Sequence, residues 1–184
     1  MKKVLSILIV LTALVFVSGA NAADTGFYIG AGGQHAWENF SNTDGIDVDN
    51  SFGINLRAGY QLMKYLAIEA NYDWYNGFDL KWSGYDLGSI MVQTAMIDLK
   101  GMYPINDFVP YVRLGGGWMW AKFDGKNGYG NSSDNDFAWD FGAGIDYYIN
   151  KNISIGPNIK YVIGTGNLDN IKYTAVGFGL EYHF

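Results

Sequence analysis

The chain has 184 residues, with 12 lysines and arginines, 18 aspartates and glutamates, and no cysteine. The lack of cysteine excludes disulfide bonds and a lipidated N-terminal cysteine, and the net charge of −6 disfavours nucleic-acid binding. Beyond the N-terminal segment, no apolar run reaches the roughly 20 residues of a membrane-spanning helix. Any insertion into a membrane must therefore use a closed sheet, because lipid does not tolerate unpaired strand edges.

The first 22 residues have the features of a secretory signal. Two lysines precede an apolar run from Val4 to Val17, and Ala20-Asn21-Ala22 fits an A-x-A cleavage site. That run is shorter than a membrane-spanning helix needs to be. We therefore expect residues 1–22 to be removed and residues 23–184 to form one domain, with an N-terminal membrane anchor as the alternative.

Eight later segments alternate apolar residues with polar ones or glycine, which is the period of a β-strand with two unlike faces. Phe52 to Leu62 is the clearest, because one parity is wholly apolar and the other holds Gly, Asn, Arg and Gln. In chain order the segments are 27–37, 52–62, 66–75, 90–103, 108–122, 137–149, 153–163 and the last eight residues. We predict an all-β fold, an eight-stranded antiparallel up-and-down transmembrane β-barrel.

The connections and the aromatic residues support a barrel in a membrane. Short turns are expected at 63–64, 104–107 and 150–152, and longer Gly/Asn/Asp-rich loops at the other end. Tryptophans of the apolar parity fall near the long loops, other aromatic residues fall near the short turns, and aliphatic residues lie between them. This asymmetry and these two belts are typical of outer-membrane barrels, with short periplasmic turns and long external loops. The alternative fold is a soluble lipocalin-like barrel with its aromatic residues inside. It is disfavoured, because so many rings in an eight-stranded interior would leave no ligand cavity.

The opposite parity assigns the charged side chains to the lumen. Counting from the short turns places seven charges at similar heights in the periplasmic half: Arg57, Glu69, Asp98, Lys100, Arg113, Asp146 and Glu181. Isolated charges in a narrow lumen are costly, so we expect them to be paired. This lumen charge cluster is interpreted as a structural plug that fills the barrel, and the alternative is a charge gate or selectivity ring.

The sequence shows no catalytic, cofactor or metal motif. The two histidines, His35 and His183, have no serine or carboxylate at a spacing that suggests a partner. The acidic loops near Asp47 and Asp124 lack the spacing of a calcium loop. We expect a protein that is not an enzyme, with no cofactor and no metal site.

The final strand carries a further signal. Phe178, Leu180, Tyr182 and Phe184 alternate with glycine or polar residues, and the chain ends on an aromatic ring. Gly179, Tyr182 and Phe184 resemble the closing-strand signal of Gram-negative outer-membrane barrels. That resemblance implies recognition by the barrel-assembly machinery.

Together with Phe27 to Gly32 and Pro110 to Gly117, this strand makes the chain similar to the superfamily of small eight-stranded outer-membrane barrels. The superfamily includes the OmpA transmembrane domain, OmpX and Ail, OmpW, and the opacity-type surface proteins. The resemblance implies location in the Gram-negative outer membrane, contact with its lipid and lipopolysaccharide, and no nucleic-acid partner. We expect no wall-binding domain to follow. The expected function is a structural or surface-interaction role through external loops that bind a surface ligand, and the alternative is a narrow OmpW-like channel for small or hydrophobic solutes.

Overall fold

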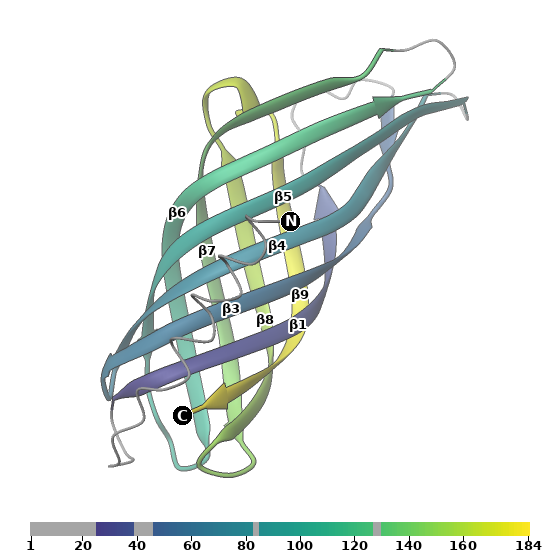
Figure 1. Ribbon diagram of the computed structural model, residues 1–184. Coiled ribbons are helices and arrows are strands. Elements are labelled where there is room, and N and C mark those ends of the chain that lie inside the picture. Colours follow the sequence, from purple (N-terminus) through teal and green to yellow (C-terminus); the bar gives the residue numbers. More distant parts are fainter. Residues whose placement is uncertain (1–24, 39–45, 83–84, 127–129) are drawn as a thin grey trace, which may run out of the picture.

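The computed structural model describes residues 25–38, 46–82, 85–126 and 130–184 (Figure 1). These residues form long strands and one short 3-10 helix, η1 (Gly166–Leu168). The strands are β1 (Gly26–Glu38), β2 (Ile46–Val48), β3 (Ser51–Met63), β4 (Leu66–Trp82), β5 (Tyr85–Met102), β6 (Phe108–Gly125), β7 (Ser132–Tyr148), β8 (Ile153–Gly164) and β9 (Lys172–His183). No helix in this part of the chain is long and apolar enough to cross a membrane.

Eight of these strands close into a barrel in which each strand pairs antiparallel with its neighbours. β1 pairs with β3 on one side and with β9 on the other, and β4 pairs with β5, so the described strands leave no open edge between them. The predicted eight-stranded up-and-down barrel is therefore confirmed. β2, which the sequence did not predict, is a short addition that pairs with the outer end of β4. The predicted signal segment, residues 1–22, lies outside the described residues.

The strands reach further at the long-loop end than the sequence predicted. β4 continues beyond Tyr75 to Trp82 and pairs with β5, which begins at Tyr85, so the loop expected there is mostly hairpin. A β-bulge lies between Tyr75 and Phe78, and Gly77 within it has a φ of +120°. Because a bulge inserts an extra residue, the side chains of Tyr75 and Phe78 both remain buried. The predicted strand ended at residue 75. The bulge at Gly77 allows the strand to continue beyond that point.

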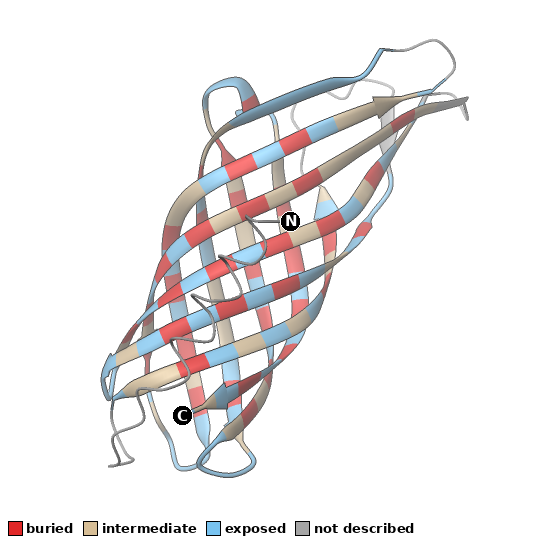
Figure 2. Ribbon diagram, in the orientation of Figure 1, coloured by how far each residue is buried: buried red, intermediate tan, exposed pale blue. Residues whose placement is uncertain are grey.

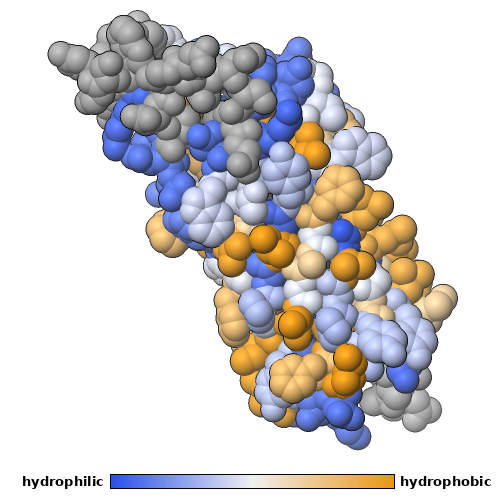
Figure 3. All heavy atoms as spheres, turned by 180° about the vertical axis from the view of Figure 1, so that it is seen from behind, coloured by the Kyte–Doolittle hydropathy of each residue, from blue (hydrophilic) through white to orange (hydrophobic). Residues whose placement is uncertain are grey.

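Burial alternates along the barrel strands, most clearly in β3, β6 and β9, as Figure 2 shows. The outward aliphatic residues are well exposed on the isolated chain and form a band across the barrel wall, visible as orange spheres in Figure 3. Trp37, Trp118, Trp120 and Trp139 project outward towards the long-loop end, and Tyr60, Tyr103, Phe108 and Tyr147 towards the short-turn end. The surface therefore has the aliphatic band between aromatic belts that a barrel presents to lipid.

Candidate functional site: buried charges of the lumen

The seven residues of the predicted lumen charge cluster all point into the barrel. Six strands supply them: β3 carries Arg57, β4 Glu69, β5 Asp98 and Lys100, β6 Arg113, β7 Asp146, and β9 Glu181. None of them is more than 6% exposed. Pleating alone dictates this direction, because successive side chains of a strand point to opposite faces.

Lys100 joins three acids from three other strands. Its Nζ lies 2.9 Å from Asp146 Oδ2, 3.5 Å from Glu181 Oε1 and 3.8 Å from Glu69 Oε2. The same nitrogen lies 4.1 Å from the ring centroid of Tyr111, close enough for a cation–π contact. A single ammonium group therefore connects β5 with β4, β7 and β9.

Arg57 and Arg113 add further ion pairs to the same acids and bring in Asp98. Arg57 Nη1 donates to Glu181 Oε1 at 2.9 Å, and Arg113 Nη1 donates to Glu69 Oε1 at 3.3 Å. Arg113 Nε lies 3.8 Å from Asp98 Oδ2, beyond hydrogen-bond distance. The seven charges thus form one continuous network. Such pairing is expected, because an unpaired charge that is buried away from water is costly.

Neutral side chains complete the network. Asn71 Nδ2 donates to both Glu69 Oε1 and Asp98 Oδ2 at 2.8 Å, and the Tyr28 hydroxyl donates to Glu69 Oε2 at 2.8 Å. Asn55 Oδ1 accepts from Arg57 Nε at 2.9 Å. Tyr28 brings β1 into the network. These partners have inward parity in the sequence, but parity alone does not reveal which groups they bond.

A second ion pair lies beside the cluster, between Lys160 of β8 and Asp73 of β4. Asp73 also accepts hydrogen bonds from Gln34 Nε2 at 2.6 Å, Asn55 Nδ2 at 2.9 Å and Thr94 Oγ1 at 2.9 Å. The sequence placed both charges in the lumen but outside the cluster. With this pair, every one of the eight barrel strands contributes a side chain to the polar contacts across the lumen.

Glycines give the two arginines room. A Cβ at Gly179 would lie 2.9 Å from Arg57 Nη2, and a Cβ at Gly142 would lie 2.5 Å from Arg113 Nε. Both distances are too short for a real contact. Gly179, predicted as part of the assembly signal, therefore also makes space for the Arg57 guanidinium.

Apolar clusters occupy the lumen on either side of the charges. The outer cluster lies towards the external end and includes Tyr75, Phe78, Val92, Met96, Met119, Val162, Leu168 and Tyr173. The inner cluster lies towards the short turns and contains Tyr28, Ala67, Met102, Val109 and Tyr111, with Tyr148 packed against it. Both clusters consist of side chains from the barrel's own strands, apart from Leu168 of η1.

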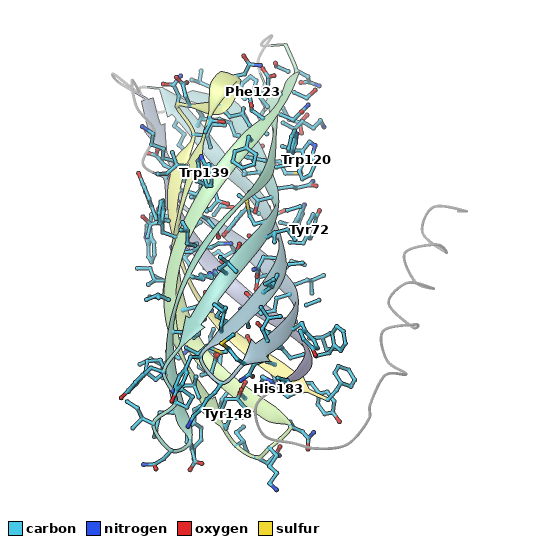
Figure 4. All side chains as sticks on the ribbon, turned by 90° about the vertical axis from the view of Figure 1, so that its left-hand side faces the viewer. Tyr72, Trp120, Phe123, Trp139, Tyr148 and His183 are labelled. Carbon is cyan, nitrogen blue, oxygen red and sulfur yellow. The ribbon has the colours of Figure 1, made fainter. Side chains whose placement is uncertain are left out.

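His183 lies at the short-turn end beside Tyr148, as Figure 4 shows. Its Nε2 lies 3.1 Å from Ser154 Oγ and 3.7 Å from Glu181 Oε2, two partners that sequence spacing did not suggest. A catalytic triad needs the carboxylate on the other ring nitrogen, where it can orient the base. Here serine and carboxylate approach the same nitrogen, and the side chain of Ser154 is buried. The geometry provides a hydrogen bond at the rim and not a nucleophile with its base.

At the external mouth, Asp136 of β7 holds the connection between β8 and β9. It accepts hydrogen bonds from the backbone amides of Phe137 at 2.8 Å and Asn167 at 3.0 Å. These two amides lower the pKa of the Asp136 carboxyl below its ordinary value. Gly166 beside it has a φ of +55°, which favours glycine. Among the described residues, no group of three or more His, Cys, Asp or Glu side chains is arranged to hold a metal ion.

Comparison with known families decides the assignment. The family model of the outer membrane protein beta-barrel domain matches residues 7–184. The chain belongs to this family. It is 28% identical to outer membrane protein A of Escherichia coli O157:H7 and 27% identical to that of Klebsiella pneumoniae, across 100% and 92% of this chain. It spans about half the length of these relatives, 55% and 54%.

Solved structures agree on the fold. Neisserial surface protein A, NspA, superposes with a TM-score of 0.71 at 17% identity, covering 89% of this chain and all of that one. OprG of Pseudomonas aeruginosa gives 0.61 at 17% identity, with 90% and 98% covered. Ail, the attachment invasion locus protein of Yersinia pestis, gives 0.56 at 19% identity, with 89% and 100% covered. Fold and family together place this outer-membrane β-barrel in the Gram-negative outer membrane.

Proposed function

We propose that this protein is a non-enzymatic outer-membrane barrel whose lumen is plugged by its own side chains. Its role is to stabilise the membrane and to present external loops to surface partners. The polar network that draws a side chain from every barrel strand is the observation that carries the proposal. Ion pairs between opposite walls, such as Lys100–Glu181 and Lys160–Asp73, cross-link the barrel through its centre.

The lumen contents support a plug over a pathway. A conducting pore needs a continuous file of water, and an eight-stranded barrel is only wide enough inside for its own side chains. Here the charges lie between two apolar clusters, and no residue of the network is exposed to solvent. All four lumen cations are already paired with acids, so an ion in transit would have to break existing pairs.

The outer wall and the last strand suggest the partners. The aliphatic band and tryptophan belt suit lipid, with lipopolysaccharide on the external side. Tyr182 and Phe184 expose their rings on the outer wall, and the Phe184 amide donates to the Phe27 carbonyl at 3.0 Å where the barrel closes. We therefore assign these rings, with Gly179, to recognition by the barrel-assembly machinery. Replacing Phe184 with Ser should reduce assembled protein in outer membranes, whereas the matched change Phe108→Ser at another short turn should not.

One observation favours the alternative, a narrow conduit for small or hydrophobic solutes. The pairing of β7 with β8 passes from Gly144–Asn158 directly to Tyr147–Ile155. Pro157 lies in this gap and has no amide to donate. This gap in the pairing of β7 with β8, which we call the seam, is where a sideways opening into lipid would form most easily. The inward residue beside it is Asp146, however, which is paired to Lys100.

Solute flux into vesicles tests the proposal. Folded protein in phospholipid vesicles should admit neither small ions nor sugars faster than vesicles without protein. A heat-dependent gel shift confirms that the barrel has folded. Flux that depends on folded protein, and that falls when Pro157→Val restores a donor to the seam, would establish the conduit instead.

A further inference from the structure

Two carboxyl groups in the centre of the lumen face each other across a glycine. Asp98 of β5 and Asp140 of β7 are the residues opposite Gly115 of β6 in the two ladders. A Cβ at Gly115 would overlap Asp98 Oδ1 and lie 2.6 Å from Asp140 Oδ1. The two oxygens therefore occupy the same small space directly above the glycine, where any other residue would separate them.

Neither of these oxygens has a hydrogen-bond donor among the described residues, and both carboxyl groups are at most 1% exposed. Buried oxygens without a partner are rare and require an explanation. The other oxygen of Asp98 is fixed, because Asn71 Nδ2 donates to its Oδ2 at 2.8 Å. That bond directs Oδ1 towards Asp140.

The charged groups that face the two carboxyls are engaged elsewhere. Arg113 donates to Glu69 and approaches Asp98 no closer than 3.8 Å, and Lys160 pairs with Asp73. Glu69 and Asp73 add further negative charge nearby. Across the described lumen, four cations face six acids: Arg57, Lys100, Arg113 and Lys160 against Glu69, Asp73, Asp98, Asp140, Asp146 and Glu181. Full ionisation would leave an uncompensated excess of negative charge at this pair.

We propose that Asp98 and Asp140 form a proton-binding site, in which a single proton is shared between their two Oδ1 atoms. One O–H bond on either carboxyl donates to the other, so a single proton satisfies both oxygens and removes one negative charge. A proton needs only these two oxygens, whereas a metal ion requires further ligands that the surrounding residues do not supply. The proton thus links β5 to β7 across β6. This inference is independent of whether the lumen conducts.

Infrared spectroscopy of the folded protein in vesicles tests the site. At neutral pH we expect the carbonyl band of one protonated carboxyl per barrel, shifted by deuterium and by ¹³C-labelled aspartate. The band should vanish in Asp98→Asn and in Asp140→Asn. It should persist in the control Asp134→Asn, which changes an exposed external acid. Absence of the band, or its survival in both lumen variants, would overturn the proposal.

The pH dependence of the unfolding midpoint provides a second readout. A carboxylate that only forms an ion pair would not show the same dependence. In Asp98→Asn the amide oxygen can accept from Asn71 while the NH₂ group donates to Asp140, in place of the shared proton. We expect this variant to keep the wild-type unfolding midpoint at neutral pH and to lose less stability than the wild type as pH rises. Asp146→Asn, which removes a carboxylate paired to Lys100, should lower the midpoint. Equal loss in both variants would contradict the proposal, and if Asp98→Asn does not fold, the band in Asp140→Asn decides.

Discussion

The two halves of the lumen solve the same filling problem with different chemistry. Towards the external end, Tyr75, Phe78 and Met119 pack in the outer cluster. In the periplasmic half, between that cluster and the inner cluster, Lys100, Arg113 and Glu69 fill the lumen with ion pairs. An apolar side chain needs only matching volume, whereas a buried charge needs a partner at one position and orientation. We therefore expect the charged half to be the less tolerant of substitution, even where volume is preserved.

The largest effect should follow removal of Glu69, which bonds or pairs with Tyr28, Asn71, Lys100 and Arg113. Glu69→Leu leaves Arg113 without its hydrogen-bonded carboxylate and Lys100 with two acids in place of three. Breaking a buried pair from one side costs about 3–5 kcal/mol. The change in unfolding free energy is measured by urea titration of the protein in vesicles, with heat-dependent gel mobility as the readout of folding. The control Asp124→Leu removes an exposed partner of Lys122 and should cost at most about 1 kcal/mol. Similar losses for both variants would mean that the network is not structural.

The next largest effect is expected at the ion pair of Lys160 with Asp73. Lys160→Met alone leaves Asp73 unpaired and should be strongly destabilising, whereas adding Asp73→Asn should recover part of the loss. We expect a coupling energy of roughly 0.5–3 kcal/mol, in the range of contacting residues. A double-mutant cycle on unfolding free energy measures it. Strict additivity would show that the pair contributes nothing specific.

A smaller effect is expected in the outer cluster. Met119→Leu changes the shape of a buried side chain but keeps an apolar group of similar size, and such swaps usually cost less than about 1.5 kcal/mol. The matched swap in the charged half, Glu69→Gln, should cost more, because it removes charge without changing size. The same urea titration compares the two. A reversed order would refute the contrast between the halves.

The smallest effect should be local to the external mouth. Because the pKa of Asp136 is lowered in the folded state, its contribution is present above its ordinary pKa and is lost as pH falls through the lowered value. Acidification below about pH 4 should therefore lower the protection of the Asn167 amide, measured as its exchange rate relative to that of an unfolded amide at the same pH. In Asp136→Asn this exchange should already be faster at neutral pH, with little change in global unfolding. An amide protected equally in both proteins would contradict this role.

Sequence parity was enough to predict the barrel and its two faces, because the pleat leaves each side chain only two directions. Counting heights also placed seven lumen charges in one layer. It did not reveal that Lys160 bonds Asp73, because that contact crosses the lumen between β8 and β4, which are not neighbours in the sequence. The outer ends of the strands were predicted too short, since Gly77 was read as a loop residue and instead lies in a bulge.

Single-channel conductance distinguishes most directly between lumen charges that form a structural network and lumen charges that line a pathway. The folded protein would be compared with Arg57→Ala and Arg113→Ala in a planar bilayer. We predict silence in all three, because the apolar clusters on both sides of the charges remain intact in each variant. Discrete steps whose size or ion preference changes in the arginine variants would contradict a purely structural network. They would mean that the charges line a route through the barrel.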